Sequence, residues 1–244
     1  MRIFLLGKDY QGDSLYPLSE KERHYLRHVL RLNINDVFTA KDKEGRTFKA
    51  FLFDEGTLAL EETDRPDETL LDGLSSYRGP FSDITMMVSL LKGKKNEIEI
   101  RMLTEMGIKH IVLMETEFTD KGNRRTDRYE KIMKEAVQQS GAEPPEITGP
   151  LPFSEALSLA KGRILIMHQS QTQETMRLLT ALEGANGPVT CLIGPEGGFS
   201  GKECETAVRA GAVPVLLETN ILRAETAAVY SAAVIQAVLH SRRS

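Results

Sequence analysis

The feature that most constrains this chain is a regular alternation of strand-like and helix-like segments that fills its last two thirds. Apolar runs of strand length, 83–91 and 108–115, alternate with segments of helical period. In one such segment the apolar residues at helical spacing are Ile98, Met102, Leu103 and Met106. Strands and helices in strict turn are typical of a mainly parallel sheet that is covered on both faces. The sequence therefore predicts an α/β domain over residues 73–244.

The beginning of the chain has a different pattern. Three short runs, VFTAKD, TFKAFLF and TLALEE, are rich in β-branched and aromatic residues and are separated by turn formers. A short helix should precede them, because Ser19 and Glu22 have the spacing of a capping box. Glycine, serine and proline then gather at 73–80, as expected at a boundary. We therefore expect a small β-rich domain over residues 1–72.

The composition is that of an ordinary globular protein. With 27% charged and 41% hydrophobic residues, wholesale disorder is excluded, and no apolar stretch approaches the roughly 20 residues of a membrane span. Lys8 and Asp9 interrupt the apolar start too early for a signal peptide. Two cysteines are too few for a disulfide framework or a four-cysteine zinc site. We expect a cytoplasmic protein without a membrane partner.

The net charge of -4 argues at first against a nucleic-acid partner, which usually leaves a basic footprint. The charge is unevenly spread, however. Residues 53–72 contain one basic residue against eight acidic ones, whereas residues 1–52 contain ten basic and seven acidic ones. Because net charge reports on solubility and long-range attraction and does not locate a site, an RNA partner stays open. Its nonspecific affinity should be modest.

A glycine-rich segment, CLIGPEGGFSGKE at 191–203, is the first candidate for chemistry. It follows an apolar strand and precedes a helix that Ser200 and Glu203 can cap. Glycines let the backbone approach a ligand closely, and ligands bind at the carboxyl ends of strands in open α/β sheets. The spacing matches neither the dinucleotide fingerprint nor the P-loop. The alternative interpretation is an ordinary glycine-rich turn.

A second candidate is the segment 215–234, VLLETNILRAETAAVYSAAV. A strand ends at Leu217, and a long apolar helix begins near Ala224. Arg223 and Glu225 then lie at the mouth of the same strand edge, where the helix N-terminus favours Glu225 as a carboxylate. The alternative interpretation is a common pair of a helix-start acid and a neighbouring arginine.

Two basic clusters complete the candidates. In the segment 24–32, four side chains share one helical face: His24, Arg27, His28 and Arg31. The second cluster surrounds a strand-to-helix turn and consists of Lys92, Lys94 and Lys95. Both clusters are consistent with phosphate contacts. The alternative interpretation of each is an ordinary solvated surface. The two histidines have the spacing of some zinc sites, but no H-E-x-x-H pattern exists, so we expect no metal.

Taken together, these segments resemble the RsmE family, the ribosomal RNA small-subunit (uracil-N3)-methyltransferases of the SPOUT superfamily. The matching stretches follow the family order over nearly the whole chain: HYLRHVLRLNINDVF, KGKKNEIEIRMLTEMGIKHI, EAVQQSG, LIGPEGGFSGKE and ILRAETA. The pairing of GPEGG with ILRAETA about 25 residues later is the most specific part of the resemblance.

The resemblance implies a particular fold and a particular set of partners. The fold would be an N-terminal PUA-like β-barrel that helps to hold RNA, at 1–72, followed by a SPOUT α/β domain with a C-terminal deep trefoil knot, at 73–244. The cofactor would be S-adenosylmethionine. The protein would work as a homodimer with its active site at the subunit junction, and its partner would be small-subunit ribosomal RNA, free or in an assembled subunit.

The implied activity is S-adenosylmethionine-dependent methylation of N3 of a uridine in 16S (small-subunit) ribosomal RNA. The cofactor would be bound by Gly194, Pro195, Glu196, Gly197, Gly198, Leu217, Ile221 and Leu222. Arg223 would stabilise the developing uracil anion, and Glu196 and Glu225 are candidates for proton acceptance or target orientation. RNA would be positioned by Arg27, Arg31, Lys92 and Lys94.

The sequence departs from the family pattern in several places. Glu218 and Asn220 stand in a segment where the family reads Leu-Gly-x-Arg, and Phe118 and Ala142 stand where an arginine is usual. These losses of positive charge favour an alternative function, that of an RNA-binding or ribosome-assembly protein of the same fold with weakened catalysis. A nucleotide-dependent α/β enzyme is a third hypothesis, and the absent loop spacings weaken it.

Overall fold

The structure is a computed structural model of the 244-residue chain, and it describes residues 3–34, 36–63, 83–119, 126–168 and 175–241. The chain forms two compact units. The first comprises Met1–Tyr77 and Lys134–Pro144, and the second comprises Arg78–Met133 and Pro145–Ser244. The predicted domain boundary between residues 72 and 73 lies outside the described residues.

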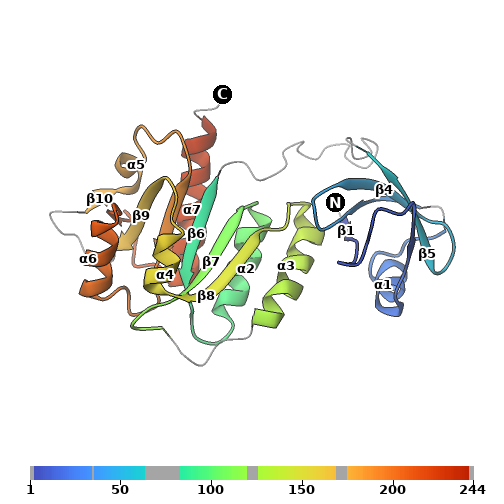
Figure 1. Cartoon of the computed structure of the whole chain (residues 1–244), viewed down its shortest axis with the longest axis horizontal. Coiled ribbons are helices and arrows are strands. Elements are labelled where there is room, and N and C mark those ends of the chain that lie inside the picture. The colour runs from blue at the N-terminus through green and yellow to red at the C-terminus, as the bar shows by residue number, and fades with distance from the viewer. Residues whose placement is uncertain (1–2, 35, 64–82, 120–125, 169–174, 242–244) are drawn as a thin grey trace. The chain divides into compact units, whose positions relative to one another are not determined.

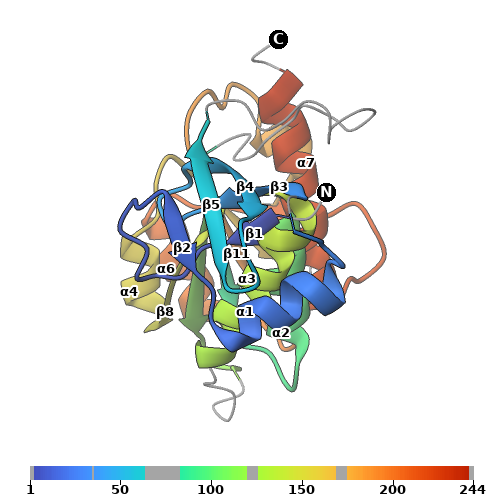
Figure 2. The same cartoon turned by 90° about the vertical axis from the view of Figure 1, so that its right-hand side faces the viewer.

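The first unit contains a five-stranded sheet with the strand order β1-β3-β4-β5-β2. The strands are β1 (Ile3–Leu5), β2 (Leu15–Pro17), β3 (Val37–Lys41), β4 (Thr47–Leu52) and β5 (Thr57–Glu62). β1 pairs with β3 in parallel, and the other pairs are antiparallel. The sheet curls on itself into a half-barrel (Figures 1 and 2). The three short runs predicted as strands are β3, β4 and β5.

Alternation along the strands makes the core of this unit. Phe48, Ala50 and Leu52 of β4 are buried while the residues between them are half-buried, because successive side chains of a strand point to opposite faces. The helix α1 (Glu20–His24) begins at the predicted capping box and continues as a π-helical turn, η1 (Tyr25–Val29). The basic segment 24–32 is therefore helical only in its first part.

The second unit contains a seven-stranded sheet with the order β10-β12-β9-β11-β6-β7-β8. The strands are β6 (Ile84–Ser89), β7 (His110–Glu115), β8 (Glu146–Pro152), β9 (Arg163–His168), β10 (Met176–Arg177), β11 (Val189–Ile193) and β12 (Val213–Leu216). Every pair of neighbouring strands is parallel. The alternation along the sequence predicted this sheet, whose strands Figure 1 shows side by side.

Helices cover both faces of the parallel sheet. The helices that follow α1 and η1 along the chain are α2 (Lys95–Glu105), α3 (Thr126–Ser140), α4 (Phe153–Ser158), α5 (Leu178–Ala181), α6 (Gly201–Arg209) and α7 (Ala224–Ser241). Met86 and Val88 of β6 pack in a core with α2 and α7, whereas Met87 packs in a second core with α4 and α6. Adjacent side chains of β6 thus pack on opposite faces of the sheet. Because helices cover both faces, every residue of β6 is buried.

The buried face of α2 differs from the predicted one. Ile98 and Met102 are 39% and 37% exposed, whereas Ile100 is fully buried. The buried residues of this helix are Asn96, Glu99, Ile100, Leu103 and Thr104. Counting apolar residues alone misplaced the face, because three of its five buried residues are polar.

No helix in the described parts of the chain is both long enough and apolar enough to cross a membrane.

The packing of α2 gives a test with a matched control on the same helix. We expect Ile100→Ala to lower the free energy of unfolding by about 2–5 kcal/mol, because it leaves a cavity in a closed core. Ile98→Ala deletes the same atoms from a more exposed position, and we expect it to cost no more than about 1 kcal/mol. Urea unfolding of both variants measures the difference. Equal losses would contradict the observed orientation of α2.

Candidate active site

A cavity of about 300 Å³ opens where β9, β11 and β12 end. Because these strands are parallel, their carboxyl ends lie at one edge of the sheet, which is where ligands bind in α/β folds. The walls come from the end of β9, from the loop 193–198, and from the segment that leads from Leu216 into α7. The volume is at the lower end of the roughly 300–1,000 Å³ of small-molecule sites.

Most of the predicted cofactor-binding residues meet in this cavity. Seven of the eight line it: Gly194, Pro195, Glu196, Gly198, Leu217, Ile221 and Leu222. Gly197 does not line it, and neither does Glu225, whereas Arg223 does. Met167 and His168 of β9 are lining residues that sequence reasoning missed, because the sequence does not reveal that β9 lies between β11 and β12.

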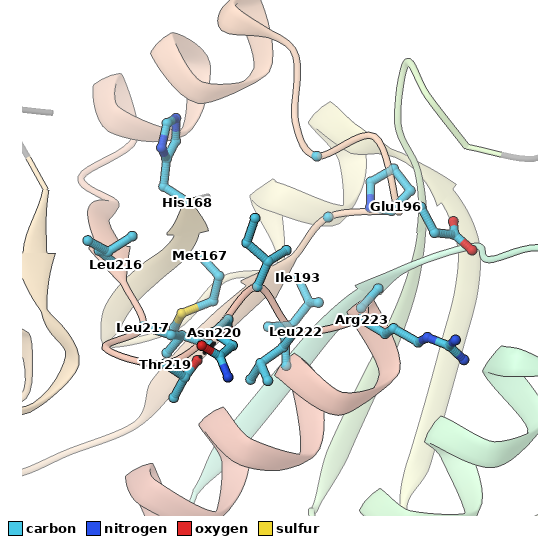
Figure 3. Close-up of a pocket in the computed structure, with 16 residues that line it drawn as sticks. Met167, His168, Ile193, Glu196, Leu216, Leu217, Thr219, Asn220, Leu222 and Arg223 are labelled. Carbon is cyan, nitrogen blue, oxygen red and sulfur yellow. Dashed lines mark hydrogen bonds between the residues drawn. The ribbon is translucent and has the colours of Figure 1, made fainter. Parts of the chain in front are cut away.

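The inner wall of the cavity is mainly apolar. Figure 3 shows Met167, Leu217 and Leu222 gathered around it, with Thr219 and Asn220 beside them. The segment after Leu217 turns sharply, since the Thr219 amide donates to the Leu217 carbonyl (2.9 Å) and the Thr219 hydroxyl donates to the Asn220 carbonyl (2.8 Å). Apolar side chains with a short polar turn suit a ligand that combines a flat ring with polar edges.

At two glycines of the loop after β11, Gly194 and Gly197, a β-carbon would be crowded. A β-carbon at Gly194 would lie 3.1 Å from the carbonyl carbon of Gly198, and one at Gly197 would lie 3.1 Å from Cβ of Phe118. Gly197 therefore supports the loop from outside the cavity. Phe118, which stands where an arginine is usual, is 50% exposed at this contact.

Glu203 anchors the far end of the glycine loop. Its Oε2 accepts the Ser200 amide (2.8 Å) in the predicted capping box, and its Oε1 accepts the Glu117 amide (2.8 Å). One buried carboxylate thus joins the start of α6 to the loop after β7. The glycine loop is held between β11 on one side and this capped helix on the other.

Glu196, at the tip of the loop, forms an ion pair with Lys95 of α2 at 2.5 Å. Partial burial raises the pKa of Glu196, but the hydrogen bond and the charge of Lys95 outweigh it and hold the pKa below its usual value. Glu196 is therefore a carboxylate at neutral pH. Lys95 belongs to the basic cluster that the sequence indicated, and its partner was not predicted.

Arg223 immediately precedes α7, and its carbonyl accepts the Ala227 amide (2.8 Å) in the first turn of that helix. In Figure 3 the side chains of Arg223 and Glu196 both extend away from Met167 and Leu217, toward the same side of the site. A cation and an anion thus stand at one end of a largely apolar cavity. Such an arrangement can orient a polar ring and stabilise negative charge on it.

A buried polar network lies behind this end of the site, and sequence reasoning missed it. Asn96 accepts the Leu91 amide (2.7 Å) and donates to the Ser89 carbonyl (3.0 Å) and to Oε2 of Glu99 (2.9 Å). The Ser89 hydroxyl donates to the carbonyl of Ile193, which lines the cavity (3.0 Å). A polar pair at positions 96 and 99, on the same helical face as Leu103, is the signal that could have revealed it.

The predicted RNA-binding residues fall in both units. In the first unit, Arg27 forms an ion pair with Glu55 (3.1 Å), and Arg31 is exposed with a positive φ of 58°. In the second unit, Lys92 and Lys94 are exposed in the turn between β6 and α2. This turn leads directly to Lys95, so it places both lysines beside the ion pair with Glu196.

Two further departures from the family pattern have a structural account. Glu218 does not line the cavity; its carboxylate forms an ion pair with Arg177 (3.0 Å), so its charge is compensated. Ala142 is buried in the first unit.

Among the residues that the structure describes, no group of three histidine, cysteine, aspartate or glutamate side chains could hold a metal ion.

Solved structures of two other proteins have a similar fold. A Porphyromonas gingivalis probable rRNA-methyltransferase superposes with a TM-score of 0.81 at 24% identity, covering 100% of both chains. A ribosomal RNA small subunit methyltransferase E from Neisseria gonorrhoeae, bound to S-adenosyl methionine, superposes with a TM-score of 0.78 at 22% identity, covering 98% of both chains. These likenesses establish the fold.

Sequence comparison establishes the family. Residues 78–236 match the RNA methyltransferase domain. The ribosomal RNA small subunit methyltransferase E of Synechocystis sp. is 32% identical over 232 residues, which cover 92% of this chain and 73% of the relative. The protein of the same name from Rickettsia conorii is 29% identical, over 96% of this chain and 94% of the relative. The chain belongs to the ribosomal RNA small subunit methyltransferase E family.

Proposed function

We propose that this protein transfers a methyl group from S-adenosylmethionine to N3 of a uridine in the RNA of the small ribosomal subunit. Membership of the family supports the reaction and the class of substrate. The observation in the structure that carries the proposal is the cavity at which the glycine loop 193–198 and the segment 216–224 meet. These two segments contain the paired GPEGG and ILRAETA motifs.

The residues of the cavity fit S-adenosylmethionine. Its adenine ring and methionine chain suit the apolar wall around Leu217 and Leu222, and the backbone of Gly194 and Gly198 is open to its polar groups. S-adenosylmethionine carries no phosphate, which explains why the glycine loop has neither phosphate-binding spacing.

When bound, S-adenosylmethionine supplies a methyl group on a positively charged sulfur, which is already electrophilic. The task of the chain is therefore to align the acceptor nitrogen with this methyl group and to favour loss of the N3 proton. Arg223 can stabilise the negative charge that develops on the uracil ring. The first turn of α7 fixes the backbone of Arg223 at the cavity wall.

We assign Glu196 to orientation of the target. Its carboxylate can accept a hydrogen bond from the uracil N3–H, and its lowered pKa makes it release an accepted proton readily to water. Glu225 does not line the cavity, so we do not place it at the acceptor nitrogen.

The finer features of the resemblance belong to the same proposal. They are a PUA-like barrel at 1–72, a SPOUT domain at 73–244 with a deep trefoil knot, a homodimer with its active site at the subunit junction, and a cytoplasmic location. The curled sheet of the first unit supports the barrel. The substrate is the free RNA or an assembled subunit, contacted by Arg27, Arg31, Lys92 and Lys94.

A second candidate is an RNA-binding or ribosome-assembly protein of the same fold with weakened catalysis, which the exposed Phe118 and the lost arginines favour. The pairing of Glu218 with Arg177 outside the cavity lining weighs against it, because Glu218 then does not obstruct a cofactor.

Mass-spectrometric mapping of ribosomal RNA tests the proposed reaction. Small-subunit RNA from cells that lack this protein should lose one N3-methyluridine, and the purified protein with S-adenosylmethionine should restore it. Calorimetry separates the two candidate functions, because only the enzyme requires the cofactor. Failure to bind S-adenosylmethionine at millimolar concentration would refute the enzymatic function.

Arg223→Ala tests the catalytic assignment. Loss of the cation should lower the rate of methyl transfer by about 10²–10³-fold, as removal of one charge-stabilising donor does in other enzymes. The melting temperature should hardly change, because the side chain is exposed. Arg209→Ala, at the exposed end of α6, is the matched control and should leave the rate unchanged. Turnover of Arg223→Ala at the wild-type rate would show the assignment to be wrong.

Arg31 and Glu55 test the RNA surface of the first unit. Arg31→Ala should weaken RNA binding similarly for all sequences and reduce the slope of log affinity against log salt by about 1. Glu55→Gln removes the partner of Arg27 and should strengthen RNA binding, because the guanidinium becomes available to phosphate. Filter binding over a range of salt concentrations measures both effects. Unchanged affinity in both variants would exclude this surface.

A further inference from the structure

Two acidic side chains on neighbouring helices of the second unit each contain an unsatisfied oxygen. Glu99 of α2 is fully buried, and Glu225 lies in the first turn of α7, which packs against α2. Within the described parts of the chain, neither Oε1 of Glu99 nor Oε2 of Glu225 has a hydrogen-bond partner. A buried polar atom without a partner is costly, so an arrangement that satisfies both oxygens at once is strongly favoured.

Asn96 determines which oxygen of Glu99 is free. Its amide donates to Oε2 of Glu99 at 2.9 Å, and its other bonds to Ser89 and Leu91 leave it no freedom to turn. Oε1 is then the atom available to bear a proton. A protonated Oε1 can donate to Oε2 of Glu225, which would satisfy both orphan atoms with one hydrogen bond.

The electrostatics of the site favour a proton on Glu99. Burial raises its pKa to about 8; the hydrogen bond from Asn96 opposes this shift, and repulsion by Glu225 and Glu196 adds to it. The titratable groups that face Glu99 are Glu225 from α7, Glu196 from the glycine loop, and the phenol of Tyr129 from α3. Glu196 is already paired with Lys95.

We infer that Glu99 and Glu225 share one proton across the contact between α2 and α7, and that this proton positions the first turn of α7 at the cavity. Arg223 and Ala224, which line the cavity, belong to that turn or directly precede it. On the other side, Glu99 is connected through Asn96 and Ser89 to Ile193. The shared proton therefore joins the two segments that form the cavity. Its link to catalysis rests on the proposed function.

Nuclear magnetic resonance of the full-length protein with ¹³C-labelled glutamate carboxyl groups tests the shared proton directly. One carboxyl signal should titrate near pH 8, and it should be absent from Glu99→Gln. Glu225→Gln should lower the pH at which that signal titrates, because it removes a repelling charge. If every glutamate of the wild-type protein titrates below pH 6, the inference is wrong, and this result needs no variant.

The pH dependence of stability gives a second readout. Glu99 has a higher pKa in the folded protein than its ordinary value of 4.5, so between about pH 4.5 and 8 the folded state holds a proton that the unfolded chain has lost. The stabilisation from this proton is fully present below pH 4.5 and is lost as the pH rises through 8. Glutamine imitates the protonated acid at every pH.

The melting temperature of Glu99→Gln, relative to that of the wild type, should therefore rise from pH 5 to pH 8 and then stay level. Glu105→Gln, an exposed change on the same helix, is the matched control and should show no such trend. A difference between Glu99→Gln and the wild type that does not vary with pH would overturn the inference.

Calorimetry with S-adenosylmethionine tests the positioning of α7. Above pH 8 the affinity of the wild type, divided by that of Glu99→Gln at the same pH, should fall by up to about tenfold per pH unit. The titration of S-adenosylmethionine itself affects both affinities equally, so it cancels when the wild-type affinity is divided by that of Glu99→Gln. A constant ratio would refute the positioning role. If neither protein binds S-adenosylmethionine at any pH, the proposed function fails, and the magnetic resonance and stability measurements decide the shared proton by themselves.

Discussion

The parallel pairing of β11 between β6 and β9 is the constraint on which the rest of the second unit depends. It buries β11 completely and brings the carboxyl ends of strands that are distant in sequence to one edge of the sheet. The glycine loop after β11 and the segment after β12 meet there although about 20 residues separate them. Ser89 at the end of β6 then reaches the carbonyl of Ile193, so the sheet itself carries the polar network behind the cavity.

Much of this architecture could be predicted from the sequence, because the relevant signals are local. The alternation of strand and helix periods predicted the parallel sheet with helices on both faces. The Ser-x-x-Glu spacing predicted two helix starts, at Ser19 and Ser200, and both have the capping box. The loop 194–198 was placed at a strand end by its glycines. In each case a few neighbouring residues determine the backbone, so no knowledge of distant contacts was needed.

The features that escaped prediction depend on tertiary neighbours. The order of the strands, which brings Met167 and His168 to the cavity, is not encoded in a local pattern. The buried face of α2 was misplaced because Asn96 and Glu99 are polar and yet fully buried. Their burial depends on the bond from Asn96 to Ser89 of β6 and on the bond between the two side chains, which no local pattern reveals. Gly197 was assigned to the cavity with its neighbours, but Phe118 of another loop occupies its outer side.

The Glu203 carboxylate accepts one hydrogen bond from the start of α6 and one from the loop after β7. These two bonds have a consequence for ligand recognition. A glycine-rich segment loses more conformational entropy on ordering than other segments do. When such a segment becomes ordered only on binding, this loss lowers the affinity for the ligand. Here both ends of the segment are fixed by the fold before any ligand arrives. The entropy of ordering this segment is therefore lost during folding and not on binding. A ligand that enters between the loop 193–198 and the segment 216–224 finds the glycine loop already in its bound shape.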